Sequence, residues 1–198
     1  MDLFSSSTTL TPIPVRDGEL GWLAQLPLPW ANDEVLARLV RETEWRQDSI
    51  VVYGKRHLQP RLSAWHGEKG YRYSGLTLAP LPFTPLLDTL RRAAQDATGH
   101  DYNSVLLNYY RDGGDSMGMH SDDEPELGPA PAIASVSFGA TRNFILRHKT
   151  TKETLKLPLG DGSLLFMGGA LQAHWLHGIN KTSRMIGARL NLTFRKIA

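Results

Sequence analysis

The chain has 198 residues, carries a formal net charge of +2 and is 41% hydrophobic and 21% charged. A chain of this length and composition can bury one sizeable core, and so small a net charge does not by itself indicate a polyanionic partner. The absence of cysteine excludes disulfides, thiolate zinc sites and cysteine nucleophiles, and it fits a reducing compartment.

The sequence carries no pattern typical of export or membrane insertion. Its first residues lack the basic start and apolar run of a signal peptide, and no apolar stretch approaches the length of a membrane span. We therefore expect a cytoplasmic protein, nuclear if the source is eukaryotic, without a membrane partner. We also expect one domain over residues 1–198 and a monomer.

The N-terminal part is predicted to contain an arm and a helix. Residues 1–28 are rich in Ser, Thr, Pro and Gly and show little periodicity, which predicts an irregular arm. Asn32 is the expected N-cap of the helix that follows, with acidic residues in the first turn beside the positive end of the helix dipole. The apolar stripe of this helix comprises Val35, Leu36, Leu39 and Val40.

Residues 50–73 read as strands and turns, beginning with the β-prone run 50–53. Five basic residues against one acidic residue give this segment a net charge of +4, twice that of the whole chain, and four aromatic residues are interleaved with the charges. Cations for phosphates and flat rings for bases are the composition of a nucleic-acid surface. A sheet edge with solvated cations and core aromatics fits the pattern equally well.

A second helix is predicted over residues 84–98. Thr84 is placed to cap it, Pro85 occupies its first helical position and Gly99 ends it. Six residues form its buried stripe: Leu86, Leu87, Leu90, Ala93, Ala94 and Ala97.

From residue 104 onward the pattern changes to short strands separated by glycine-rich turns. The candidate strands span residues 104–110, 133–138, 143–147, 153–157, 163–167 and 186–194. So many short strands favour a mainly β fold, a sandwich or jelly roll, with the two helices packed outside it.

A candidate metal site is formed by His120 and Asp122. They are two residues apart, so in an extended backbone their side chains point the same way. An isolated pair of this kind is more often a solvated surface pair. A third ligand from His174 or His177 would complete the two-histidine, one-carboxylate facial triad of non-heme Fe(II) oxygenases. In a strand these two histidines face opposite ways, and the residues alone do not choose between them.

The last predicted strand places four polar residues on one face: Arg189, Asn191, Thr193 and Arg195. Burying such a polar face away from water without partners costs free energy, so the face is either exposed to solvent or binds an anion. A guanidinium matches a carboxylate bidentately and keeps its charge at any relevant pH. A metal triad followed by this strand suggests a metal that uses a dicarboxylate co-substrate.

The joint spacing of these motifs resembles the AlkB family of Fe(II)/2-oxoglutarate dioxygenases, and within it the nucleic-acid demethylase branch. The matching segments are residues 108–110, 120–124, 135–139, 174–177 and 189–195. Residues 52–55 and 60–61 resemble the substrate-contacting hairpin of the branch that works on duplex DNA. The likeness covers roughly residues 50–197.

The resemblance implies a double-stranded β-helix (jelly-roll) core over residues 81–198, with a helix and nucleotide-recognition hairpins over residues 29–80. The ligands of Fe(II) would be His120, Asp122 and His177. Arg189 would pair with the distal carboxylate of 2-oxoglutarate, assisted by Tyr110 and Asn191. Asn108 and Arg195 would contact the carboxylate that chelates the metal, where O2 also binds.

The implied reaction is oxidative demethylation of N-alkylated bases, of the 1-methyladenine and 3-methylcytosine type, in single- or double-stranded DNA. It couples 2-oxoglutarate decarboxylation to methyl hydroxylation and formaldehyde release, as in DNA alkylation repair. The expected substrate contacts are Val52, Tyr53, Gly54, Trp65, His66 and Glu124. Tyr53 would fill the gap that a flipped base leaves in the duplex. Trp65 or His66 would stack on the flipped base, and Glu124 would attract the positive charge of the methylated base.

Other readings remain open on the sequence alone. The same chemistry could act on RNA or on a protein side chain. A non-catalytic jelly-roll module with a structural metal is a different class, although it would have no use for Arg189 and Arg195 beside the ion. A zinc hydrolase is disfavoured by the absence of cysteine and by the carboxylate receptor.

Overall fold

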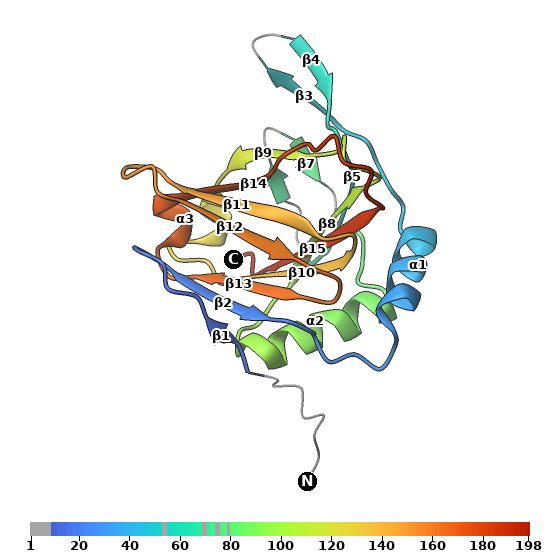
Figure 1. The fold of residues 1–198 in the computed structure, drawn as a ribbon. Coiled ribbons are helices and arrows are strands. Elements are labelled where there is room, and N and C mark those ends of the chain that lie inside the picture. The colour runs from blue at the N-terminus through green and yellow to red at the C-terminus, as the bar shows by residue number, and fades with distance from the viewer. Residues whose placement is uncertain (1–8, 53–54, 69–70, 74–75, 79) are drawn as a thin grey trace.

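The computed structural model describes residues 9–52, 55–68, 71–73, 76–78 and 80–198, and for residues 50–52, 55, 71–73 and 76–78 it describes the backbone alone. Two β-sheets form the body of the molecule, and helices α1 and α2 lie on the outer side of the larger sheet (Figure 1). This arrangement confirms the prediction of a mainly β, jelly-roll fold with flanking helices. No helix in the described ranges is long and apolar enough to cross a membrane.

Both sheets are antiparallel. The larger has the order β1 (Thr11–Pro12), β2 (Glu19–Leu23), β13 (Leu164–Gly168), β10 (Ile133–Gly139), β15 (Arg189–Arg195), β8 (Ser104–Tyr110) and β5 (Leu62–Gly67). The smaller has the order β12 (Thr154–Leu159), β11 (Arg142–His148), β14 (Trp175–Ile179) and β9 (Met117–His120).

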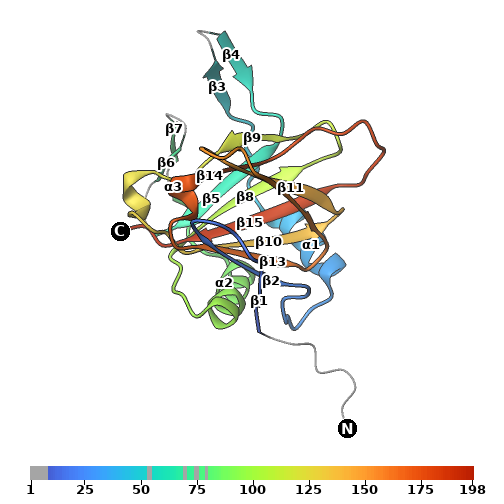
Figure 2. The same ribbon diagram turned by 60° about the vertical axis from the view of Figure 1, so that its left-hand side comes forward.

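Two hairpins stand apart from these sheets. Strands β3 (Ser49–Val52) and β4 (Lys55–Leu58) form the first, and β6 (Tyr71–Tyr73) and β7 (Leu76–Leu78) form the second. The β3–β4 hairpin projects well beyond the body in both ribbon views (Figures 1 and 2). It lies within the segment for which the sequence predicts recognition hairpins.

The strand alternation of β15 divides the interior into two cores. Leu190, Leu192 and Phe194 belong to a cluster between the larger sheet and helices α1 (Asn32–Glu42) and α2 (Pro85–Thr98). A second cluster fills the space between the two sheets. The four polar residues of β15 are also buried, so the reading of an exposed polar face is wrong. Their face opens into a pocket instead.

The two helices test the capping predictions. In α2, Thr84 Oγ1 accepts a hydrogen bond from Leu87 N at 3.2 Å, and Gly99 ends the helix with a φ of 73°, which confirms both ends. In α1 the N-cap is Ala31 rather than Asn32, and no side chain caps the helix. Asn32 instead exchanges side-chain hydrogen bonds with Gln25 at 2.9 and 3.1 Å.

Several predicted boundaries need correction. The arm predicted as irregular contains β1 and β2, because Leu20 and Leu23 are buried where β2 pairs with β13. The strand predicted over 104–110 is confirmed at both ends. The last strand begins at Arg189 rather than at residue 186. Strand β14, the short helix α3 (Leu171–His174) and the 3-10 turn η1 (Pro125–Leu127) complete the described fold.

Candidate metal and co-substrate site

Adjacent strands of the smaller sheet bring two histidines together. His120 on β9 and His177 on β14 are direct cross-strand partners, and their ring centroids lie 4.4 Å apart. Asp122 follows β9 by two residues and is completely buried. Strand register therefore brings His177 to the His120 and Asp122 pair, which lies far from it in the sequence.

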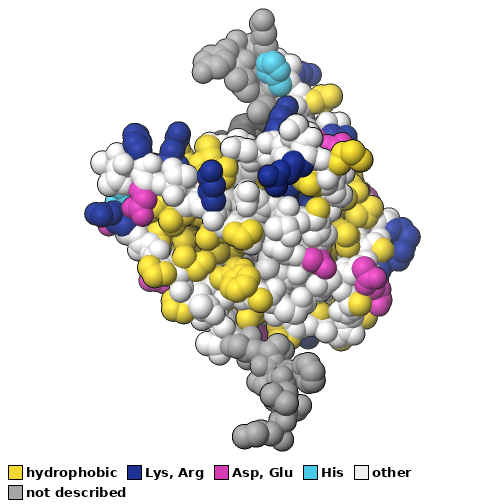
Figure 3. All heavy atoms as spheres, viewed as in Figure 1, with side chains coloured by type: hydrophobic (Ala, Val, Ile, Leu, Met, Phe, Trp, Pro, Cys, Tyr) yellow, Lys and Arg dark blue, Asp and Glu magenta, His cyan; other side chains and the backbone are white. Residues whose placement is uncertain are grey.

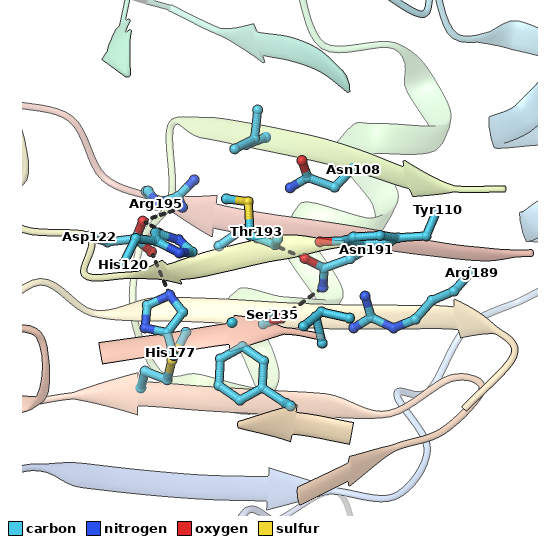
Figure 4. A pocket seen from close by; sticks show the side chains of 16 residues that line it. Asn108, Tyr110, His120, Asp122, Ser135, His177, Arg189, Asn191, Thr193 and Arg195 are labelled. Atoms are coloured by element: carbon cyan, nitrogen blue, oxygen red, sulfur yellow. Dashed lines mark hydrogen bonds and ion pairs between the residues drawn. The ribbon is translucent and has the colours of Figure 1, made fainter. Parts of the chain in front are cut away.

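The three side chains converge on one point (Figure 4). His120 Nε2 lies 3.8 Å from Asp122 Oδ1, and His177 Nε2 lies 3.9 Å from Asp122 Oδ2. All three ligand atoms fall within 4.8 Å of one another. These separations suit three donors around one divalent ion, which would bind each of them at about 2 Å.

Two local features fit a metal ion at this point. Asp122 Oδ2 is buried and has no hydrogen-bond partner among the described residues, so a cation at this point would satisfy it. His120 Nδ1 lies 2.9 Å from Gly118 O. A proton on Nδ1 would satisfy that carbonyl and leave the lone pair of Nε2 for the ion, as metal-binding histidines commonly do.

The protonation states also suit metal binding. Burial, together with the nearby His120, lowers the pKa of His177 to about 3, so the ring is neutral at pH 7. Burial would raise the pKa of Asp122, but Arg195 and the two histidines outweigh it and hold that pKa at about 2. The site therefore presents a neutral imidazole at His177 and a carboxylate at Asp122, the forms of these groups that bind a cation.

Further contacts fix the orientation of the triad. Gln172 Oε1 accepts a hydrogen bond from Asp122 N at 3.0 Å, and Ser121 Oγ donates to Trp175 O at 2.9 Å. The Phe144 ring stacks on His177 with a centroid separation of 5.2 Å. These contacts tie the end of β9 to the start of β14.

Arg189 occupies the other end of the same pocket (Figure 4). It is 1% exposed, and its Nη2 donates to Ser137 Oγ at 2.8 Å. Its Nε and Nη1 are buried without a hydrogen-bond partner in the described part of the chain. Burial lowers the pKa of Arg189 to about 10, although Tyr110 opposes the shift. A buried guanidinium with two unused donor nitrogens is suited to receive a carboxylate.

Polar side chains connect Arg189 with the triad. Asn191 Nδ2 donates to Ser135 Oγ at 2.8 Å, and Thr193 Oγ1 donates to Asn191 Oδ1 at 3.1 Å. Asn108 also lines the pocket, and its Oδ1 accepts a hydrogen bond from Arg61 Nε at 2.8 Å. The Asn108 Nδ2 group is thus the end of this amide that remains for a ligand.

Arg195 has a partner that the sequence did not reveal. Its Nη2 donates to Asp122 Oδ1 at 2.8 Å, and both side chains are buried. Arg195 also lines the pocket. Its contact with a co-substrate carboxylate stays a prediction, whereas its ion pair with Asp122 is a feature of the structure.

His174, the alternative ligand, lies elsewhere. It ends helix α3, is exposed, and forms a second group with Asp17 and His148. In that group His148 Nδ1 accepts hydrogen bonds from the backbone N–H of Thr150 and Thr151, so Nε2 carries the proton and donates to Asp17. A metal at His148 would have to displace this proton, and His174 stacks on the His148 ring with a centroid separation of 5.9 Å.

The structure describes the side chains of only some of the expected substrate contacts. Tyr53 and Gly54 lie outside the described residues, and Val52 is the last described residue of β3. Cross-strand pairing puts Trp65 beside Leu106, which lines the pocket. His66 faces the opposite side of β5, where its Nδ1 lies 2.7 Å from Pro82 O, which disfavours a stacking role. Glu124 is half-buried just before η1.

Sequence reasoning missed several groups around the pocket. Ser135 and Ser137 hold Asn191 and Arg189, and their alternation along one strand was a signal that could have identified them. The sequence places Arg61 among the cations of a nucleic-acid surface and in a substrate-contacting hairpin, yet its side chain is buried, with 5% exposed. Met117, Phe144 and Met167 form the apolar wall.

Comparison with known proteins agrees with this geometry. The 2OG-Fe(II) oxygenase superfamily matches residues 20–195. Alpha-ketoglutarate-dependent dioxygenase alkB homolog 3 of Rattus norvegicus is 45% identical over 175 residues, which cover 83% of this chain and 59% of that protein. DNA oxidative demethylase ALKBH2 of Homo sapiens is 42% identical over 178 residues, covering 83% and 68%.

Among solved structures, that of OsALKBH1 superposes with a TM-score of 0.65 at 19% identity, covering 93% of this chain and all of that one. This likeness supports the fold. A match over most of the chain defines its class: the protein belongs to the 2-oxoglutarate- and Fe(II)-dependent oxygenase superfamily and, within it, to the AlkB family. The chain spans about three fifths of the length of the alkB homolog 3 proteins that it matches.

Proposed function

We propose that this protein is an Fe(II)- and 2-oxoglutarate-dependent dioxygenase that removes methyl groups from N-alkylated bases in DNA. The observation that carries the proposal is the meeting of the His120, Asp122 and His177 donor atoms in one pocket with Arg189. Relatives that are 42–45% identical carry the names DNA oxidative demethylase and alpha-ketoglutarate-dependent dioxygenase.

Residues at one end of the pocket would bind the metal, and residues at the other end would bind the co-substrate. His120, Asp122 and His177 would hold Fe(II), and the unused donors of Arg189 would receive the distal carboxylate of 2-oxoglutarate. Arg195 stands at the metal end, paired with Asp122, and Asn108 lines the pocket opposite Asn191 in the strand register. Fe(II) with 2-oxoglutarate and O2 supplies the oxidising power that converts an N-methyl group to a hydroxymethyl group, which is lost as formaldehyde. The apolar wall formed by Met117, Phe144 and Met167 would exclude water from this chemistry.

A basic surface supports a nucleic-acid partner. Arg147 on β11 and Lys156 on β12 are exposed on the outer face of the smaller sheet, and Lys181 and Arg184 are exposed on the loop after β14. None of these four makes an ion pair within the described ranges. Figure 3 shows Lys and Arg side chains across the upper part of this face. Unpaired cations in a row suit a phosphate backbone.

The projecting β3–β4 hairpin supports a duplex substrate. The base of its stem is closed by the Gln59 backbone N–H, which donates to Asp48 O at 2.8 Å, and Arg61 just beyond contacts Asn108 of the body. A hairpin at this position could enter a duplex and hold a flipped base near the pocket. Methylation on the pairing edge makes such a base cheaper to extrude than a normal one.

Two other functions compete with this proposal. RNA carries the same phosphates and bases, so the basic surface does not by itself distinguish it from DNA. A non-catalytic metal module would leave Arg189 buried without an anion, at a large desolvation cost. Charge and the hairpin therefore favour an enzyme acting on nucleic acid over the module.

The discriminating experiment compares matched substrates. Formaldehyde release should be measured from single-stranded DNA, duplex DNA and RNA that contain 1-methyladenine, and from a methylated peptide, each with and without Fe(II) and 2-oxoglutarate. We expect release from DNA that requires both additions. Release from the peptide or RNA alone would assign another substrate, and no release from any would favour the binding module.

A further inference from the structure

Arg142 is a buried cation that the assigned site does not use. It opens strand β11 and is 5% exposed, on the same inner face as Phe144. Its Nη1 donates to Asp112 O at 3.2 Å, and its Nη2 donates to Asp115 O at 3.0 Å and to Asn180 O at 2.6 Å. Three carbonyl oxygens thus offset the cost of burying this guanidinium.

These carbonyls belong to two loops that lead to the metal strands. Asp112 and Asp115 lie on the loop that enters β9, which carries His120, whereas Asn180 directly follows β14, which carries His177. The loops also touch each other, because Thr182 N donates to Gly113 O at 2.9 Å. A Cβ at Gly113 would lie 2.6 Å from Thr182 O, so this close approach requires glycine.

Arg142 also approaches the co-substrate end of the pocket. Its guanidinium carbon lies 5.9 Å from the centre of the Tyr110 ring, and that of Arg189 lies 5.3 Å from the same ring. Two cations therefore share one aromatic residue in a buried region. Their repulsion adds to burial in lowering the pKa of Arg189, and an anion bound at Arg189 would relieve it.

We propose that Arg142 is a positioning residue of the oxygenase reaction, which clamps the loops before β9 and after β14 and supports Tyr110 beside Arg189. This inference rests on the ligand and co-substrate roles proposed above. Without the clamp the two metal strands can shift relative to each other, and small displacements of reacting groups are costly in such sites. Removal of a group that hydrogen-bonds a metal ligand typically weakens metal binding by about 10–100-fold, and Arg142 acts one step further out, through the loops, so we expect the lower end of that range.

Three variants of the full chain separate positioning from general stability. Arg142→Met removes the clamp, and Arg142→Lys keeps the charge but cannot reach three carbonyls with a planar fork. Arg91→Met is the matched control. Arg91 is half-buried on α2, donates to Tyr102 O at 3.3 Å and lies 4.9 Å from the centre of the Phe83 ring, far from the pocket. Each variant is assayed for melting temperature, and anaerobically for Fe(II) binding and Fe(II)-dependent 2-oxoglutarate binding.

We expect Arg142→Met to weaken both Fe(II) and 2-oxoglutarate binding by about tenfold, and Arg142→Lys to weaken them by about threefold. Arg91→Met should lower the melting temperature while both dissociation constants stay within about twofold of the wild type. If Arg142→Met does not fold, the binding constants of Arg142→Lys test the positioning role. Unchanged binding in either folded Arg142 variant, or equal weakening in Arg91→Met, would overturn the positioning role. A wild-type protein that binds no 2-oxoglutarate with Fe(II) would overturn the proposed site as well.

Discussion

Arg195 and Asp122 form a buried ion pair in which Arg195 Nη2 lies 2.8 Å from Asp122 Oδ1. One carboxylate oxygen is thereby neutralised by the protein, whereas the other has no hydrogen-bond partner in the described residues. The pair keeps the carboxylate ionised despite complete burial. In the proposed metal site, Arg195 would therefore hold Asp122 in the ionised form that binds a metal.

The first prediction tests this pair. Arg195→Met leaves a buried carboxylate without its cation, so the free energy of unfolding of the metal-free protein should fall by about 3 kcal/mol. Urea unfolding measures this loss. Adding Asp122→Asn to the same variant removes the orphaned charge and should recover part of the stability. A fall in the single variant below about 0.5 kcal/mol would show that the pair is not a stabilising contact.

The second prediction separates the two candidate histidine ligands. His177→Ala should weaken Fe(II) binding more than about 100-fold, because a ligand matters at least as much as the groups that orient it. His174→Ala should leave the Fe(II) affinity unchanged, since His174 lies at the exposed end of α3 beside Asp17. Isothermal titration under anaerobic conditions provides the comparison. Strong weakening by His174→Ala would exchange the roles of the two residues.

The third prediction concerns the carboxylate receptor. Arg189→Met should weaken 2-oxoglutarate binding by roughly thirtyfold, the equivalent of about 2 kcal/mol, because it removes a buried charged donor. Fe(II) binding should be nearly unaffected, since Arg189 lies at the far end of the pocket from the triad. Equal 2-oxoglutarate affinity in the variant and the wild type would remove Arg189 from the site.

The fourth prediction addresses the basic outer face of the smaller sheet. The double change Arg147→Gln and Lys156→Gln should weaken binding to any DNA sequence and reduce the slope of log affinity against log salt by about 2. Fluorescence anisotropy over a salt series gives both quantities. Arg92→Gln, an exposed change on α2, serves as the control. An unchanged slope in the double variant would place the DNA on another surface.

The fifth prediction uses Tyr102, which packs against Phe194 of β15. Burial raises the pKa of Tyr102 to about 12 from 10.0, against the opposing effect of its hydrogen bond with Thr98. Because the folded-state pKa lies above the unfolded one, this contribution to stability is complete below pH 10 and is lost as the pH rises towards 12.

The expected loss over that range is about 3 kcal/mol. Tyr102→Phe should remove this part of the alkaline decline, which urea unfolding at several pH values would reveal. Parallel declines in both proteins would mean that the Tyr102 hydroxyl ionises in the folded state as easily as in the unfolded one.

Features of the fold that depend only on neighbouring residues could be predicted from the sequence. The Thr84 cap, the Gly99 stop and the alternation along β15 are each decided within a few residues, and the structure contains all three. The alternation also showed which residues share a face, although burial of that face depends on the smaller sheet lying over it.

Contacts between distant residues could not be predicted in this way. Arg195 and Asp122 are 73 residues apart, and Arg61 and Asn108 are 47 apart. The insertion of β2 beside β13 likewise depends on tertiary pairing that overrides a turn-rich composition. The choice between His174 and His177 depended on a short helix, α3, where alternation along a strand does not apply.

The central claim is that one pocket joins a metal triad to a 2-oxoglutarate receptor and uses them to demethylate DNA. The most direct measurement is the yield of succinate and formaldehyde from oligonucleotides containing 1-methyladenine, for the wild type and for His177→Ala. We predict that both products form in equal amounts with the wild type only when Fe(II) and 2-oxoglutarate are present, and that His177→Ala forms neither. Formaldehyde release by His177→Ala at the wild-type rate, or its complete absence with the wild type, would contradict the account.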